Sequence, residues 1–131
     1  MSDSFYIQQR DGITLLKSRL LDNFPYIRHA FSTRKGGIST EECDSLNLAW
    51  KRRDSRENVI ENHRRFASAM GIKPENFVFI ELKHSDRVIT VTSESRSSGR
   101  WWDGIPSDYD GIITRDLNTV SYTHLTLPTI R

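Results

Sequence analysis

The chain has 131 residues, 36% of them hydrophobic and 27% charged, a composition typical of a soluble globular protein. Its 19 basic and 17 acidic residues leave a net charge of +2, too small and too evenly scattered to indicate nucleic acid or a membrane surface as a partner. No apolar run of about 18 residues predicts a membrane span, no signal peptide is visible, and a single cysteine excludes an internal disulfide, so we expect a cytoplasmic protein.

The first predicted elements form a β-hairpin. Residues 5–9 and 13–16 have strand composition, and Asp11-Gly12 between them suits a type I′ turn. A third strand is predicted over residues 26–34, where apolar side chains alternate along one face.

A long loop and the clearest helix come next. Residues 38–53 show no period and are predicted to form an ordered loop. Residues 55–70 carry apolar side chains at helical spacing with charged residues opposite, which predicts an amphipathic helix. Asp54 and Glu57 resemble a capping box at its start, and Gly71 is suited to its end.

The remaining elements are strands and turns. Residues 77–82 are an apolar run that predicts a buried strand, His84 lies in a turn, and residues 87–92 predict another strand. Residues 93–100 form a polar loop or flap, and residues 110–114 predict a further strand. Strands mixed with one good helix predict an α+β fold, a layered sandwich of mixed α/β elements.

One stretch, STRKGGIS at residues 32–39, has the composition of an anion site. Arg34 is a potential bidentate donor, and Gly36 and Gly37 can expose backbone N–H groups to a phosphate. The alternative is a strand-to-loop turn that requires flexible residues.

The four histidines show no metal-ligand spacing. His29 alternates with apolar residues and His63 lies near the apolar stripe of the helix, so both are predicted to pack. His84 directly follows a buried strand, a position where sites are often built. Cys43 lies in an acidic stretch that disfavours a reactive thiolate, so an inert cysteine is predicted.

Five motifs in order, HAFSTRKGGIS, DSLNLAW, ENVIENHRRF, FIELKHSDRV and DYDGIIT, resemble the laccase-domain family. This family is also called multicopper polyphenol oxidoreductase, or purine nucleoside phosphorylase of the peptidoglycan-editing-factor type. The resemblance covers roughly residues 27–119, and its strength lies in the order and spacing of the motifs. Leu82-Lys83 and Ser85 depart from the family's usual residues around the histidine, and Arg53 replaces a common glycine.

The resemblance implies a metal, zinc or alternatively copper, held by two histidines and a cysteine. His84 falls on the first histidine, as metal ligand and catalytic residue, while the motifs of the other two ligands are absent. Cys43 is no substitute, because it precedes the helix.

The implied activity is phosphorolysis of adenosine, inosine and methylthioadenosine with phosphate as co-substrate, together with adenosine deamination. The resemblance implies substrate- or anion-binding roles for Arg34, Gly36, Gly37 and Asn47, and a supporting role for Asp110. The alternatives are a copper-dependent polyphenol oxidase and a non-enzymatic module that recognises phosphate. A three-ligand mononuclear site suits phosphorolysis better than four-electron oxidation, which needs several coppers.

The last twelve residues, 120–131, do not continue the family pattern. Val120 to Thr129 can be back-translated, with permitted codons, to the end sequence of a transposase-based sequencing-library adapter, and both flanking codons are consistent with it. A natural strand is the alternative. We expect residues 1–119 to be the N-terminal portion of a laccase-like domain and residues 120–131 to be non-native, which excludes His124 from the site. One metal ligand of three would leave the chain itself inactive.

Overall fold

A computed structural model describes five segments of the chain: residues 4–50, 53–79, 84–92, 109–117 and 120–122. The chain divides into two compact units, Met1–Ile72 and Lys73–Arg131. No helix in the described segments is long and apolar enough to cross a membrane.

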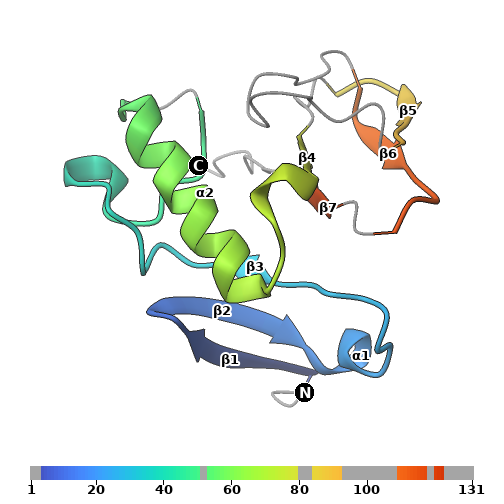
Figure 1. The fold of residues 1–131 in the computed structure, drawn as a ribbon, viewed down its shortest axis with the longest axis horizontal. Coiled ribbons are helices and arrows are strands. Elements are labelled where there is room, and N and C mark those ends of the chain that lie inside the picture. The colour runs from blue at the N-terminus through green and yellow to red at the C-terminus, as the bar shows by residue number, and fades with distance from the viewer. Residues whose placement is uncertain (1–3, 51–52, 80–83, 93–108, 118–119, 123–131) are drawn as a thin grey trace, which may run out of the picture. The chain divides into compact units, whose positions relative to one another are not determined.

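The first unit begins with the predicted hairpin (Figure 1). Strands β1 (Phe5–Arg10) and β2 (Ile13–Ser18) pair antiparallel over their whole length. Asp11 and Gly12 between them have φ angles of 52° and 80°. Two successive residues with positive φ are what a type I′ turn requires, so the predicted turn is confirmed.

The predicted strand over residues 26–34 is wrong for most of its length. Only β3 (Phe31–Ser32) pairs with β2, at the edge of a sheet ordered β1-β2-β3. Before it the chain forms α1 (Arg19–Asp22) and then a turn in which the Ile27 N–H donates to the Phe24 carbonyl at 3.0 Å. The proline at the second position of that turn fixes a φ that favours turning over extension.

The sheet has one buried and one exposed face, as the alternation of its side chains dictates. Ile13 and Leu15 of β2 are buried and contribute to the core, and helix α2 packs on this strand. On the opposite face Ile7, Leu16 and Phe31 are direct cross-strand neighbours, with 69%, 37% and 69% of their surface exposed.

Helix α2 (Arg56–Met70) confirms the predicted helix and adds Val59, Phe66, Ala67 and Ala69 to this core, to which the preceding loop adds Leu46 and Leu48. Its N-cap is Ser55, whose hydroxyl accepts from the Asn58 N–H at 3.1 Å. The predicted cap at Asp54 is therefore wrong by one residue, because the Asp54 carboxylate bonds to the preceding loop as well. Gly71 ends the helix at φ 70°, as predicted.

The described residues between β3 and α2, 33–50 and 53–55, form a loop, as predicted, with a short 3₁₀ helix, η2 (Glu41–Cys43), that the sequence did not indicate. Cys43 is half-buried there, and its thiol donates to the Arg53 carbonyl at 3.8 Å.

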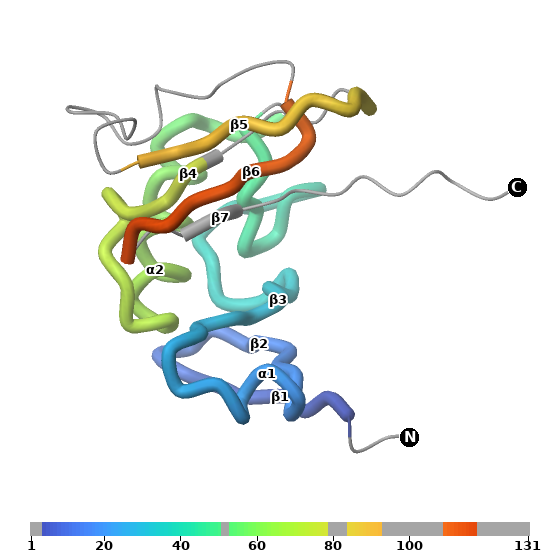
Figure 2. The backbone as a smooth tube through the Cα atoms, turned by 90° about the vertical axis from the view of Figure 1, so that its right-hand side faces the viewer, coloured from blue at the N-terminus to red at the C-terminus, as the bar shows by residue number. Residues whose placement is uncertain are grey.

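In the described residues of the second unit the chain forms η3 (Pro74–Asn76) and four short strands. These strands form two parallel pairs, shown in Figure 2. They are β4 (Phe77–Phe79) with β7 (Val120–Tyr122), and β5 (Val88–Thr90) with β6 (Gly111–Ile113).

The strands predicted at residues 77–82, 87–92 and 110–114 are thus present over their described cores. Leu82-Lys83, the predicted flap at residues 93–100 and His124 lie outside the described residues. Strand β7 is formed by Val120–Tyr122, the first three residues of the segment that was predicted to be non-native.

Candidate functional site

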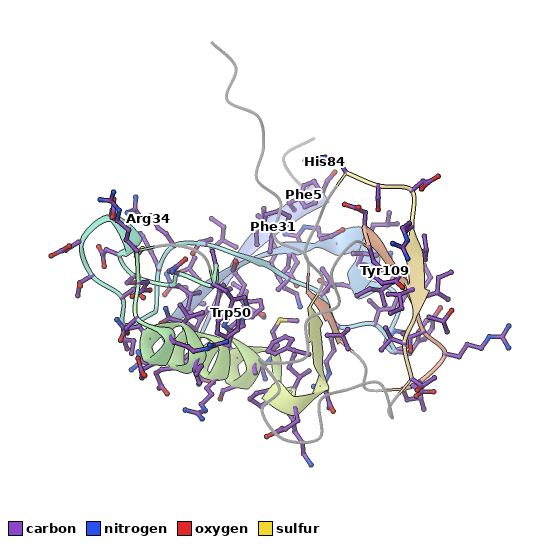
Figure 3. The ribbon with its side chains drawn as sticks, turned by 90° about the horizontal axis from the view of Figure 1, so that it is seen from above. Phe5, Phe31, Arg34, Trp50, His84 and Tyr109 are labelled. Atoms are coloured by element: carbon purple, nitrogen blue, oxygen red, sulfur yellow. The ribbon has the colours of Figure 1, made fainter. Side chains whose placement is uncertain are left out.

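The loop that carries Arg34 is closed by hydrogen bonds to that residue. The Arg34 carbonyl accepts from the backbone N–H groups of Ser45 and Leu46, at 2.9 and 2.8 Å. In the side chain of Arg34, Nε donates to the Asp44 carbonyl at 3.0 Å. Because Nε is fixed in this way, the two terminal nitrogens form the outer end of an exposed guanidinium (Figure 3). We call residues 34–48 the Arg34 loop.

Gly36 and Gly37 are required by two different constraints. Gly36 has φ 107°, and a Cβ there would lie 2.6 Å from the Gly12 carbonyl oxygen. At Gly37 a Cβ would lie 2.1 Å from the Ser45 carbonyl oxygen and 2.5 Å from the Leu46 Cα, so space alone demands glycine. The two glycines therefore let the loop pack against its neighbours.

Only part of the predicted anion-binding set faces outward. The Gly37 N–H donates to the Ser45 hydroxyl at 3.1 Å, inside the loop. The Gly36 N–H has no acceptor among the residues that the structure describes. The groups that remain for an anion are the Arg34 guanidinium and the Gly36 amide.

Asn47, predicted as a binding residue, uses its amide within the loop. Its Nδ2 donates to Asp54 Oδ2 at 3.0 Å and its Oδ1 accepts from the Ala49 N–H at 3.1 Å. This geometry gives Asn47 the role of ordering the loop.

The Asp54 carboxylate joins the loop to the start of α2. It accepts from the Ser39 hydroxyl at 2.5 Å, from Asn47 at 3.0 Å, from the Asn58 amide at 3.1 Å and from the Ser55 N–H at 2.9 Å. Burial by itself raises the pKa of Asp54, but these hydrogen bonds outweigh it and hold the pKa below its ordinary value.

Sequence reasoning missed Asn62, which is fully buried on α2. Its Oδ1 accepts from the Ile38 N–H at 2.9 Å, and its Nδ2 donates to the Ser39 hydroxyl at 2.9 Å and the Asn47 carbonyl at 2.8 Å. An asparagine beside the apolar stripe of a helix was the available signal, since a buried amide needs partners.

His63 packs in the core, as predicted. Its ring stacks on Trp50 with centroids 4.9 Å apart and planes 9° from parallel, and its Nδ1 bonds to the Val59 carbonyl at 2.8 Å. Burial lowers the pKa of His63 to about 4, although the hydrogen bond to Val59 acts in the opposite direction. His29 is half-buried, and its Nε2 accepts from the Ser18 N–H at 2.8 Å.

In the second unit, the Asp110 carboxylate holds the turn that carries His84. Its Oδ1 accepts from the His84 N–H at 3.0 Å, and its Oδ2 accepts from the Ser85 N–H at 2.7 Å and the Ser85 hydroxyl at 2.6 Å. Asp110 directly precedes β6, and its own N–H donates to the Arg87 carbonyl at 2.9 Å. His84 has φ 59°, an uncommon conformation for a residue with a side chain, and is exposed (Figure 3).

The described residues do not complete a metal centre. They contain no group of three His, Cys, Asp or Glu side chains placed to share an ion. Both Asp110 oxygens are engaged by the turn, which leaves His84 as a single candidate ligand there.

Comparison with known proteins gives the family. The model of the multi-copper polyphenol oxidoreductase laccase family matches residues 28–125, a range that includes both Arg34 and His84. The chain belongs to this laccase-domain family. The resemblance of the five motifs is thereby confirmed.

Relatives of the laccase domain are named as phosphorylases. The mouse protein "Purine nucleoside phosphorylase LACC1" is 39% identical over 109 residues, which are 80% of this chain and 22% of the relative. "Purine nucleoside phosphorylase YlmD" of Bacillus subtilis is 30% identical over 89 residues, 67% of this chain and 32% of the relative. The chain thus spans less than a third of the length of these two relatives.

Solved laccase-domain structures confirm the predicted fold. Bacillus licheniformis YfiH matches with a TM-score of 0.75 at 25% identity, over 91% of this chain and 43% of that protein. YlmD of Geobacillus stearothermophilus matches with a TM-score of 0.74 at 26% identity, over the same shares.

Proposed function

We propose that the protein to which this chain belongs is a metal-dependent purine nucleoside phosphorylase. The observation that carries the proposal is the family match over residues 28–125, together with relatives that bear this name. The substrates would be adenosine, inosine and methylthioadenosine with phosphate, and adenosine deamination would be a second activity of the same site.

The Arg34 loop supports phosphate as the second substrate. A guanidinium held at Nε offers its two terminal nitrogens as a fixed fork, which matches two oxygens of a phosphate. The Gly36 amide can add a neutral donor to the same anion. Asn47 would order the loop around this site through its bonds to Asp54 and Ala49.

His84 would contribute one ligand to the metal, for which we propose zinc, with copper as the alternative. A zinc with an open position polarises an oxygen or activates a bound water. Since the described residues supply one ligand of three, we assign no step to a metal on this chain and expect the chain alone to be inactive. Asp110 would support His84 by holding its backbone.

We also propose a cytoplasmic location and a native segment of residues 1–119. Support for this boundary comes from the permitted back-translation of Val120 to Thr129 to an adapter sequence, whereas the family match runs on to residue 125. Resequencing the source DNA across codon 119 with an independent library chemistry tests the boundary. A frame that continues into an apolar strand, an Ala-Asp-Cys and a later histidine supports it, and survival of VSYTHLTLPTIR with its stop codon contradicts it.

The activity is tested in the full-length protein by phosphate-dependent release of adenine from adenosine. We expect Arg34→Ala to raise the phosphate concentration for half-maximal rate by about tenfold or more, since a charged hydrogen-bond donor is lost. Arg64→Ala, which removes an exposed arginine from α2, is the matched control and should leave that concentration unchanged.

Two results would contradict the proposal. An unchanged phosphate dependence in Arg34→Ala would remove the anion role of the loop. Oxygen consumption with phenols, without phosphorolysis and with more than one copper per chain, would indicate a polyphenol oxidase.

A further inference from the structure

Asn62 is a polar residue in the middle of a helix and in the core of the first unit. It has no exposed surface. An amide buried in this way is costly unless all its hydrogen-bonding groups have partners. Both N–H donors and the Oδ1 acceptor of Asn62 are engaged, and every partner belongs to the Arg34 loop.

The three partners lie on two different limbs of that loop, the first running from Arg34 to Ser39 and the second from Asp44 to Leu48. The Ile38 N–H and the Ser39 hydroxyl belong to the first limb, and the Asn47 carbonyl belongs to the second. Gly37 packs so closely that a Cβ there would lie 2.6 Å from Asn62 Oδ1. One side chain of α2 therefore bridges the two limbs.

The same two limbs set the position of the Arg34 guanidinium. Arg34 and Gly36 lie on the first limb, while Asp44, which holds Arg34 Nε, and Ser45, which donates to the Arg34 carbonyl, lie on the second. If the limbs separate, the guanidinium loses the carbonyl that orients it. Asn62 therefore acts on a bound anion through the loop that carries Arg34 and Gly36.

The hydrogen bonds that begin at Asn62 continue through the loop to the Asp54 carboxylate. The Ser39 hydroxyl accepts from Asn62 and donates to Asp54, while Asn47 accepts from Asn62 at its carbonyl and donates to Asp54 at its amide. At Ser39 one hydroxyl both accepts and donates, so the bonds from Asn62 to Ser39 and from Ser39 to Asp54 polarise and strengthen each other.

We propose that Asn62 is a positioning residue that holds the two limbs of the Arg34 loop together and thereby orients Arg34 for binding phosphate. The inference rests on the proposed phosphate role of Arg34. It adds a residue outside the binding site whose removal changes anion affinity.

The test uses the 131-residue chain and inorganic phosphate as the probe. Asn62→Asp has nearly the same shape and keeps an acceptor for the Ile38 N–H, but it loses both N–H donors. Asn58→Ala is the matched control, because Asn58 lies one turn earlier on α2 and bonds to Asp54 without touching the loop. NMR signals of Arg34 Nε–H and the Gly36 amide report phosphate binding.

We expect saturable shifts in the native chain, a dissociation constant about tenfold higher in Asn62→Asp and a change within about twofold in Asn58→Ala. Equal phosphate affinity in the native chain and in Asn62→Asp would overturn the inference. If phosphate shifts neither signal in the native chain, the phosphate role of Arg34 fails, and amide exchange still decides the role of Asn62.

Hydrogen exchange at the amides of Ser45 and Leu46 reads the closure of the limbs without any ligand. Asn62→Asp should speed exchange of both by about tenfold and leave the helix-terminal amide of Gly71 unchanged. If the Gly71 amide exchanges faster too, the substitution has weakened the helix itself. The test then uses Ser39→Ala in place of Asn62→Asp, because it removes one Asn62 partner on the loop and leaves the helix unchanged. Unchanged exchange at Ser45 and Leu46 in Ser39→Ala would also overturn the inference.

Discussion

The Arg34 loop and the His84 turn fix their candidate residues in different ways. Two side chains anchored at α2, Asn62 and Asp54, hold the loop by several hydrogen bonds on both limbs. In the described residues the turn is held largely by one carboxylate, that of Asp110, which accepts three bonds from His84 and Ser85. The loop is therefore held at several points on both limbs, whereas we expect one substitution, at Asp110, to release the turn.

The supporting elements explain this difference. Helix α2 has 15 residues and a cap at each end, so it is a rigid anchor for a polar network. The His84 turn precedes a strand of three residues and relies on the pairing of β5 with β6 to place Asp110.

Gly37→Ala should break the loop despite its many bonds. The new methyl group would meet the Ser45 carbonyl oxygen and the Leu46 Cα, which are backbone atoms that cannot turn aside. We expect a loss of about 3 kcal/mol in the free energy of unfolding, measured by denaturant titration. Gly12→Ala, where φ is +80° but no atom lies within 4 Å, is the control and should cost about 1 kcal/mol. Equal losses would show that crowding is not what requires glycine in the loop.

Acid should weaken the packing behind the loop. Because the pKa of His63 is lowered to about 4 in the folded chain, from 6.5 when unfolded, the unfolded state binds the proton more readily. The contribution of His63 to the free energy of unfolding is therefore fully present above the pKa of the unfolded state, 6.5. It falls as the pH drops below that pKa, by about 2 kcal/mol between about pH 7 and pH 5.

Denaturant titrations at the two pH values measure this fall, and His63→Phe, which keeps a ring beside Trp50, should abolish most of it. Asp54 does not interfere, since its pKa is lowered from 3.8 and its stabilising effect is lost only below this window. A pH dependence that persists in His63→Phe would assign the effect to another group.

Asp110→Asn should release the His84 turn and leave the strands paired. Asparagine replaces one acceptor oxygen with a donor, so the bonds to His84 and Ser85 cannot all form. We expect their amides to exchange about tenfold faster, equivalent to about 1.4 kcal/mol. The Val91 N–H, which bonds to the Ile113 carbonyl at 2.8 Å, is the internal control and should keep its protection. Unchanged exchange at the His84 amide would contradict the role of Asp110 in holding the turn.

Ser55→Ala tests the stability of α2, the helix that anchors the loop, and should have the smallest effect. Loss of the N-cap hydroxyl that accepts from Asn58 should cost about 1 kcal/mol of unfolding free energy. Ser68→Ala, at an exposed site on the same helix, is the control and should have no cost. A loss in Ser68→Ala as large as in Ser55→Ala would rule out capping as the cause.

Local chemistry made parts of the fold predictable. Asp11-Gly12 between two strand-like runs determines a hairpin turn through backbone sterics alone. The apolar spacing of residues 55–70 and the glycine at 71 likewise determine α2 and its end within the segment itself. The strand predicted at residues 26–34 is mostly absent, because a turn closed by the bond from the Ile27 N–H to the Phe24 carbonyl occupies its beginning and only Phe31–Ser32 pair with β2.

Non-local bonds explain what was missed at the candidate site. Asn62 pairs with residues 15 to 24 positions away, so nothing within its own helix indicates its partners. The positive φ of His84 depends on a carboxylate 26 positions later. Arg34 was chosen from the composition of its stretch, His84 from its position after a buried strand and from a family motif, and Asp110 from the resemblance alone. None of these signals specified the contacts that the three residues make.

The fully engaged amide of Asn62 has a consequence for natural variation in this protein. Aspartate and leucine match its shape but lack its two donors, and glutamine has the groups on a longer stem. Within the amino-acid alphabet no other residue presents two donors and an acceptor at that reach. Position 62 should therefore accept almost no replacement in a saturation screen, while Asn58, one turn away on the same helix, should accept many.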